Sequence, residues 1–366
     1  MGTFMKLFCL GLVLLFLHIG NAQAKDNFTE MTIAGSQVRT LQSEIVNQEY
    51  QLLIKTPAGY GQSNKTYPVI YFLDAQWDFP LMISTYGQSY FDGFIPEAIL
   101  VGIQWGGENP DPNVLRARDF TPSNMPRVPN SGGAEKFLQF IKQELIPFMG
   151  KEYRTNDERV LMGSSYGGLF TLYALFKQPN LFNGYIPTSS SSGWDNNLLY
   201  SYAKGFSDKK LTRPIKLYSA IGEFDSLMPA FDDLVSFFEK QNFKDVSFKF
   251  ERLARLGHAS VKGAGNTWGL HYVFSKPKLA LSNEKLSRFV GQYQDKTSNS
   301  FINVSLKQDQ LYLEMANRIQ SLVAATEFEF YQQGGFLQVG FDVLTKPQKL
   351  TVESFSGIEH YQRVQK

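Results

Sequence analysis

The sequence predicts an α/β fold with a mostly parallel central sheet, followed by a small all-β domain. Three observations predict it. Apolar segments of strand length alternate with helical patterns between Thr32 and Phe274, a glycine-flanked serine joins one of these strands to a helix, and only short strand-like segments follow Pro277. The 366 residues are more than one average domain requires. We therefore expect one large domain and one smaller domain.

Strands buried on both faces of a parallel sheet are nearly continuous apolar runs, and the first domain contains several such runs. The expected strands are Tyr50–Lys55, Tyr67–Leu73, Ile95–Ile103, Arg159–Met162, Asn183–Pro187, Ile215–Ile221 and Val246–Glu251. Apolar residues at helical spacing predict helices over Ala134–Met149, Gly168–Lys177, Pro229–Gln241 and Trp268–Phe274. The strict alternation in Val246–Glu251 is typical of a strand near the edge of a sheet.

The character of the chain changes after Ser275-Lys276-Pro277. Short strand-like segments then recur at regular spacing, which predicts a small all-β domain, such as an open barrel. These segments are Ser300–Leu306, Gln310–Glu314, Phe328–Tyr331, Phe336–Phe341 and Lys349–Glu353. The expected division is therefore a signal peptide over 1–24, an α/β domain over 25–278 and a β-rich domain over 279–366.

The N-terminal segment predicts export. Lys6 precedes the apolar run Leu7–Ile19, and Ala22-Gln23-Ala24 has the small-residue pattern of a signal peptidase site. The alternative is an uncleaved anchor, but the run is shorter than the ~20 residues of a spanning helix. We expect a periplasmic or secreted protein without a stable membrane anchor after cleavage. Cys9 is the only cysteine, so the mature chain would lack disulfides and a catalytic thiol.

The strongest chemical signal is Gly163-Ser164-Ser165-Tyr166-Gly167, which lies between a predicted strand and a predicted helix. This is the context of a nucleophile elbow, a sharp turn that exposes a reactive serine at the sheet edge of an α/β-hydrolase fold. Ser165 is the expected nucleophile, and the position of Ser164 in the pattern makes it structural. The alternative is an ordinary turn rich in glycine and serine.

A nucleophilic serine needs a general base, and His258 is the expected one because it lies in a loop after the last strand of the sheet. His271 lies in a predicted helix and is expected to be packed there. The acid should follow the strand before the amphipathic helix, where Asp225 is preferred and Glu223 is the alternative.

The remaining site residues come from loops that follow the strands. The backbone amides of Tyr166 and Gln76 are the expected donors to an oxyanion. Arg116 and Arg118 are candidates for binding an anionic substrate, with an ion pair to Asp119 or Asp111 as the alternative. Three tryptophans could line an aromatic pocket or pack in the core: Trp77, Trp105 and Trp194.

At these residues the chain resembles the esterase family of siderophore esterases, feruloyl esterases, S-formylglutathione hydrolase and mycolyl transferases. The resemblance covers roughly residues 30–275 and is strongest to hydrolases near the periplasmic trilactone siderophore esterases. Five segments carry it: 67–74, Arg116-Ala117-Arg118-Asp119-Phe120-Thr121-Pro122, the elbow, Gly257-His258-Ala259-Ser260-Val261 and 269–274. The resemblance implies that a Ser–His dyad suffices in some members. Many relatives have Leu-Asp-Gly where this chain has Leu73-Asp74-Ala75. The alanine keeps the backbone donor but changes the turn.

The expected activity is therefore ester hydrolysis without a cofactor or a metal, by a Ser-His-Asp mechanism. Candidate substrates are siderophore lactones, feruloyl or acetyl esters on polysaccharides, and small acyl esters. Acyl transfer and a non-catalytic binding scaffold are the alternatives, and the reactive residues argue against the scaffold. The formal charge of +2 is spread along the chain, which argues against a nucleic-acid partner. The sequence leaves the oligomeric state open.

Overall fold

The computed structural model describes residues 32–62, 64–206, 209–241, 243–315, 317–354 and 356–364. The predicted signal peptide over 1–24, which contains Cys9, lies outside these residues. Within the described ranges, no helix combines the length and the apolar character that crossing a bilayer requires.

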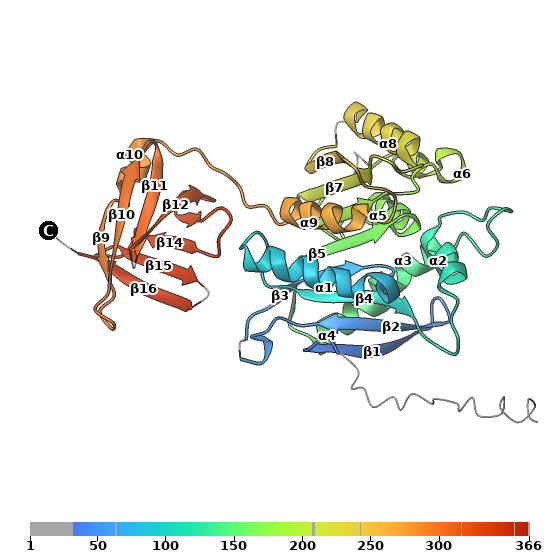
Figure 1. The fold of residues 1–366 in the computed structure, drawn as a ribbon, viewed down its shortest axis with the longest axis horizontal. Helices are drawn as coiled ribbons and strands as arrows, with labels where there is room; N and C mark the ends of the chain where they lie inside the picture. The colour runs from blue at the N-terminus through green and yellow to red at the C-terminus, as the bar shows by residue number, and fades with distance from the viewer. Residues whose placement is uncertain are drawn as a thin grey trace, which may run out of the picture. The chain divides into compact units, whose positions relative to one another are not determined.

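An eight-stranded sheet lies at the centre of the first domain, in the order β1-β2-β4-β3-β5-β6-β7-β8 (Figure 1). Its strands are β1 Ser36–Ser43, β2 Gln48–Lys55, β3 Tyr67–Phe72, β4 Ile99–Trp105, β5 Thr155–Ser164, β6 Gly184–Thr188, β7 Ile215–Gly222 and β8 Val246–Leu253. Neighbours from β4 to β8 are parallel, whereas β1 and β2 are antiparallel additions at one edge. The predicted mostly parallel sheet is confirmed, with β8 at an edge as expected. Only β1 was not anticipated, because its sequence is largely polar and a single residue, Ser43, is buried.

Helices cover the sheet on both faces (Figure 1). Their bounds are α1 Ala75–Phe91, α2 Pro112–Phe120, α3 Ala134–Phe140, α4 Ile146–Glu152, α5 Tyr166–Lys177, α6 Trp194–Asn197, α7 Leu199–Tyr202, α8 Met228–Lys240 and α9 Val261–Val273, with a π-helical turn Ile141–Leu145 between α3 and α4 and a 3₁₀ turn Tyr60–Gln62. Helix α1 packs on α9, and α2 packs on α5. Gly269 allows α9 to approach β6 closely, since a Cβ there would lie 2.4 Å from Ile186 Cγ2.

The sequence prediction missed four helices of the first domain, α1, α2 and the four-residue helices α6 and α7, and made α9 too short. Pro80 and Gly87 interrupt the apolar pattern of α1, and α2 is largely polar. Helix α9 begins at Val261 rather than Trp268, because its glycines hide the helical spacing in the first half. Two of the missed helices matter for the site, since α1 begins within the predicted oxyanion loop, residues 73–76, and α2 carries both candidate arginines.

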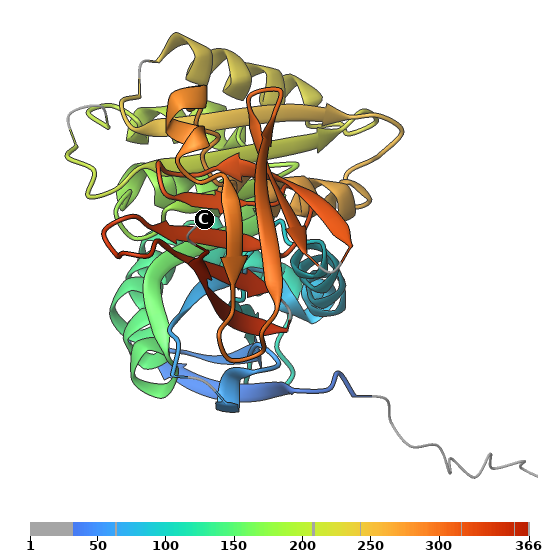
Figure 2. The same cartoon turned by 90° about the vertical axis from the view of Figure 1, so that its left-hand side faces the viewer.

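The second domain is a closed antiparallel barrel of eight strands, drawn orange to red in Figure 2. After the short helix α10 Asn283–Ser287, its strands are β9 Gly291–Gln294, β10 Phe301–Lys307, β11 Gln310–Met315, β12 Arg318–Ala324, β13 Glu329–Tyr331, β14 Gln338–Asp342, β15 Lys349–Ser354 and β16 Gly357–Arg363. The expectation of an open barrel was wrong, because β9 pairs with both β10 and β16 and closes the sheet. The barrel has its own buried cluster, which includes Phe289, Tyr293 and Leu350.

Candidate active site

Ser165 occupies the sharp turn between β5 and α5. Its backbone has φ +59° and ψ −118°, a conformation that non-glycine residues rarely adopt. The Ser165 amide donates to Thr188 O at 3.1 Å, and its carbonyl accepts from Leu169 N at 2.9 Å and Ser191 N at 3.1 Å. Gly163 is required in this turn, because a Cβ there would lie 2.4 Å from the carbonyl oxygen of Gly167.

His258 contacts a buried carboxylate. Its Nδ1 lies 2.9 Å from Oδ2 of Asp225, whose side chain is inaccessible to solvent. Burial opposes ionisation of Asp225, but the nearby Ser189 hydroxyl, the hydrogen bond from the Leu227 amide and the contact with the His258 ring outweigh it and lower the pKa of Asp225 below its ordinary value. Asp225 is therefore charged at neutral pH and orients the imidazole with its Nε2 available to a substrate-side partner.

The structure separates the two candidates for the acid. Glu223 is exposed and accepts a hydrogen bond from Arg255 N at 2.7 Å, so its carboxylate is engaged away from the imidazole. His271, the other histidine of the first domain in the described chain, contacts Ser89 and stacks on Phe94 in the packing around α9. His258 and Asp225 are thus the pair that the fold brings together.

The predicted oxyanion donors lie at the N-terminal ends of two helices. Tyr166 is the first residue of α5 and Gln76 the second residue of α1, where amide groups have no partner within the helix. Asp74 precedes α1 in a left-handed conformation, with φ +57°, and its carbonyl accepts the amides of Trp77 and Asp78. The Gln76 carboxamide is buried and has no hydrogen-bond partner among the described residues.

Arg116 has a partner that the sequence analysis did not consider. Its guanidinium forms two hydrogen bonds with Asp74, Nε to Oδ1 at 3.1 Å and Nη2 to Oδ2 at 2.9 Å. Nη2 also lies 3.4 Å from the carbonyl oxygen of Ser164. Arg116 therefore links the oxyanion loop to the elbow, and the alternative of an ion pair with Asp119 or Asp111 is wrong for this residue. The ring of Tyr166 lies 5.3 Å from the guanidinium carbon.

Arg118 and Trp105, both predicted to bind substrate, are not in the lining of the catalytic cavity. Both side chains bind Asp119, Arg118 Nε at 2.7 Å from Oδ1 and Trp105 Nε1 at 2.7 Å from Oδ2. Tyr50 adds a hydroxyl donor to the same carboxylate at 2.7 Å. A buried carboxylate needs this set of donors, so the cluster is part of the framework.

The cavity above Ser165 has a volume of about 690 Å³. Its lining includes both reactive residues and two arginines, and consists of Arg116, Arg127, Val128, Ser165, Tyr166, Ser191, Gly193, Trp194, Ser226, Leu227, Ala230 and His258. Trp194 is the tryptophan that forms a wall of this cavity. Trp77 is half-exposed beside Arg116 and is not in the lining. Arg127 was missed by the sequence analysis, since a lone arginine in a loop has no pattern.

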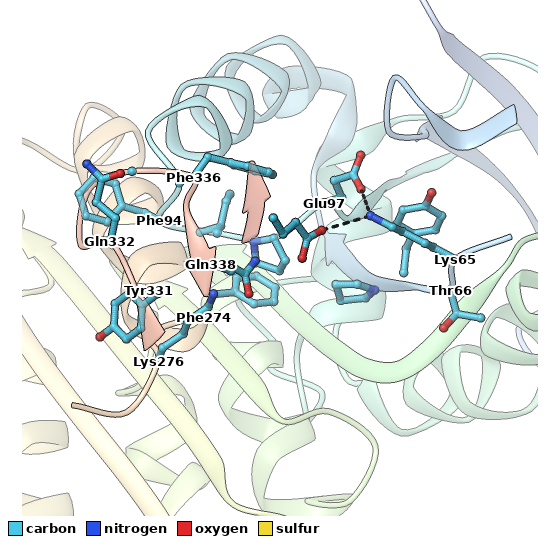
Figure 3. Close-up of a pocket in the computed structure, with 17 residues that line it drawn as sticks. Lys65, Thr66, Phe94, Glu97, Phe274, Lys276, Tyr331, Gln332, Phe336 and Gln338 are labelled. Carbon is cyan, nitrogen blue, oxygen red and sulfur yellow. Dashed lines mark hydrogen bonds and ion pairs between the residues drawn. The ribbon is translucent and has the colours of Figure 1, made fainter. Parts of the chain in front are cut away.

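A second cavity, of about 280 Å³, offers no comparable chemistry (Figure 3). Its lining is aromatic and polar, and Lys65 lies 3.8 Å from Glu97 and 3.4 Å from Glu353. Figure 3 shows Phe94, Phe274 and Phe336 around the same space. The lining contains no serine, cysteine or histidine, so this cavity offers neither a nucleophile of that kind nor an imidazole base. The described residues contain no group of three or more His, Cys, Asp and Glu that could hold a metal ion.

Comparisons with known proteins agree with this geometry. Residues 43–242 match the family model Esterase, described as "Putative esterase". The ferri-bacillibactin esterase BesA of Bacillus subtilis is 34% identical over 212 residues, which are 53% of this chain and 72% of BesA. The siderophore enterobactin esterase of Emericella nidulans is 39% identical over 88 residues, 23% of this chain and 29% of that protein.

Solved structures show the same fold in the first domain. The BES protein of Bacillus cereus superposes with a TM-score of 0.61 at 26% identity, over 67% of this chain and 97% of that chain. An IroE-like serine hydrolase of Shewanella oneidensis superposes with a TM-score of 0.60 at 26% identity, over 69% of this chain and 85% of that chain.

Replacing Ser165 with alanine should abolish turnover of p-nitrophenyl esters, because loss of the nucleophile typically lowers kcat by ~10⁴–10⁶. Steady-state kinetics measures the loss, and circular dichroism checks the fold. The control is Ser164→Ala, which removes the neighbouring hydroxyl and should retain most of the activity. Residual activity within tenfold of wild type in Ser165→Ala would exclude Ser165 as the nucleophile.

Asp225→Asn should lower kcat by roughly 10²–10⁴, because an amide in place of the carboxylate favours the wrong imidazole tautomer. Glu223→Gln is the matched control and should leave kcat within about threefold, since Glu223 only accepts a backbone amide. A larger loss in Glu223→Gln would transfer the role of the acid to Glu223. Little loss in either variant would show that a Ser–His dyad suffices.

Proposed function

The chain belongs to the Esterase family, and from that premise we propose that it is an exported serine hydrolase that cleaves the ester bonds of siderophores by an acyl-enzyme mechanism. The observation that carries the mechanism is the 2.9 Å contact between His258 Nδ1 and Asp225 Oδ2. Ser165 and His258 line one cavity, which gives a substrate access to both.

In this mechanism Ser165 Oγ attacks the ester carbonyl while His258 Nε2 takes the hydroxyl proton. The resulting oxyanion accepts hydrogen bonds from the amides of Tyr166 and Gln76. Collapse of the intermediate breaks the ester C–O bond, and His258 gives its proton to the departing alkoxide to form the alcohol. Water then attacks the acyl-serine with His258 again as the base, which releases the carboxylic acid and restores Ser165. Asp225 stabilises the imidazolium in both steps and keeps its own charge.

Arg116 acts in this mechanism as a positioning residue for the oxyanion loop. Its two hydrogen bonds to Asp74 fix the residue that precedes α1, and its contact with the Ser164 carbonyl fixes the distance from this loop to the elbow. The Arg116 guanidinium therefore contacts both segments that carry the proposed oxyanion donors, the loop before α1 and the elbow before α5. Preorganised donors of this kind stabilise developing charge without reorganisation during the reaction.

The substrate class is supported by the relatives. One relative is named a ferri-bacillibactin esterase and another a siderophore enterobactin esterase, and the first matches this chain over 72% of its own length. The cavity also has the volume of a typical small-molecule site, and its walls include the rings of Tyr166 and Trp194.

A substrate panel tests the proposal. We expect kcat/KM on a siderophore ester to exceed that on a feruloyl ester and on p-nitrophenyl butyrate by at least about tenfold, because a natural substrate uses more of the cavity for binding. The Ser165→Ala variant is the blank, and mass spectrometry identifies the acid product. A preference for feruloyl esters would replace the substrate class, and an ester product made from an added alcohol would indicate acyl transfer.

Export is supported by Lys6, the apolar run over residues 7–19 and the Ala22-Gln23-Ala24 pattern. The mature protein from the cell envelope or the medium should therefore begin at Lys25, which N-terminal sequencing or intact-mass measurement detects. The control is Ala22→Tyr with Ala24→Tyr, in which bulky residues should block cleavage. An uncleaved wild-type chain recovered from the membrane fraction would contradict cleavage and favour an anchor.

A further inference from the structure

The charges that line the catalytic cavity do not balance. Its lining contains two guanidinium groups, Arg116 and Arg127, and no carboxylate. The charge of Arg116 is compensated by Asp74. Asp225 lies outside the lining, is buried and binds His258. Arg127 forms no hydrogen bond or ion pair with any residue in the described part of the chain, so one positive charge faces the cavity without a protein partner.

The backbone presents Arg127 in a defined place. Val128 N donates to Met125 O at 2.8 Å, and the two residues form a β-bridge, which closes a four-residue turn with Arg127 at its third position. Pro126 is the second residue of the turn, where the fixed φ of proline favours a tight reversal. The side chain of Arg127 is thus the exposed tip of an ordered turn.

Partly buried hydrogen bonds hold this turn against the cavity wall. The Ser131 hydroxyl accepts the Met125 amide at 2.8 Å, and the Ser131 carbonyl accepts Asn124 Nδ2 at 3.1 Å. Ser123 Oγ accepts Trp194 Nε1 at 2.9 Å, which ties the start of the segment to the tryptophan of the cavity. The position of the turn relative to Ser165 therefore does not depend on the Arg127 side chain.

We propose that Arg127 forms an anion-binding subsite of the catalytic cavity, which selects esters whose acyl or alcohol part carries a carboxylate or another pair of anionic oxygens. This inference rests on the proposed ester hydrolysis at Ser165. A guanidinium presents two parallel N–H donors to such an oxygen pair and stays charged over the whole working pH range. Because Arg127 is exposed, its attraction for an anion decreases as salt is added.

Three p-nitrophenyl esters with six-carbon acyl chains test the subsite: the adipate hemiester, which ends in a carboxylate, the hexanoate, which ends in a methyl group, and the 6-aminohexanoate, which ends in an ammonium group. In the wild type, kcat/KM should be highest for the adipate hemiester. Arg127→Gln should lower that value by about fivefold, the upper range for an exposed ion pair, and leave the hexanoate value unchanged. Arg127→Lys should retain part of the preference, and Arg127→Glu should shift it to the 6-aminohexanoate.

Two controls separate the subsite from general charge effects. Lys136→Gln removes an exposed positive charge that does not line the cavity, and it should leave the ratio of adipate to hexanoate unchanged. Raising NaCl from about 0.05 to about 0.5 M should reduce this ratio in the wild type but not in Arg127→Gln. An equal loss on both esters in Arg127→Gln would show a structural role, and an unchanged ratio would show that no subsite exists. Either result overturns the proposal.

A binding measurement keeps this test independent of turnover. Calorimetric titration of Ser165→Ala with the adipate hemiester should give a Kd that rises about fivefold when Arg127→Gln is added. The same change should not affect the Kd of the hexanoate. If the wild type hydrolyses none of the esters, the proposed ester hydrolysis fails, while the titration still decides the subsite. An adipate Kd that Arg127→Gln does not change would overturn the subsite.

Discussion

The backbone conformation of Ser165 is the constraint on which the catalytic edge of the sheet depends. A non-glycine residue in such a conformation costs roughly 1–3 kcal/mol, which the surrounding structure must offset. Three backbone hydrogen bonds do so, and two of them come from Thr188 and Ser191, at the end of β6 and just beyond it. The elbow is therefore stable only when β6 lies beside β5. The same pairing brings Ser189 next to Asp225, so the turn of the nucleophile and the environment of the acid depend on one strand pair.

Buried carboxylates organise the rest of the site. Asp74 binds Arg116, Asp78 binds Lys262, Asp119 binds Arg118, and Asp225 binds His258. Burial raises the pKa of Asp78, although its contact with Lys262 opposes that shift. Leaving such a charge without its partner is strongly destabilising, so each pair fixes the elements that carry it. Asp74 and Asp78 lie at the start of α1. The partner of Asp74 is Arg116 on α2, which also contacts the elbow at the Ser164 carbonyl. The partner of Asp78 is Lys262 on α9, the helix that follows the His258 loop.

The C-terminal barrel is a closed sheet without free edge strands. A small sheet with free edges exposes unpaired backbone groups, and closure through β9 removes both edges. The rings of Phe289 and Tyr293 both pack against Phe341 in its interior, and the Tyr293 hydroxyl donates to the Phe289 carbonyl. The strands of the barrel that were not predicted from the sequence are β9, β12 and β16. Strand β9 is only four residues long, and β12 and β16 are mostly polar or half-exposed, so neither length nor alternation marks these three strands.

The sequence by itself determined the α/β class, seven of the eight strands of the sheet and the residues Ser165 and His258 as candidates. It could do so because buried parallel strands are continuous apolar runs, and because an elbow needs small residues at fixed spacing within a strand–turn–helix segment. Only the tertiary structure showed that Asp225 rather than Glu223 contacts His258, paired Arg116 with Asp74, placed Arg118 and Trp105 outside the cavity lining, closed the barrel and added Arg127 to that lining. The physical reason is that local patterns record which face of an element is buried, whereas the partner of a charged side chain depends on which distant loops the sheet order brings together. Arg116 and Arg118 are two positions apart on α2, yet Arg116 binds Asp74 in the oxyanion loop, whereas Arg118 binds the buried carboxylate of Asp119.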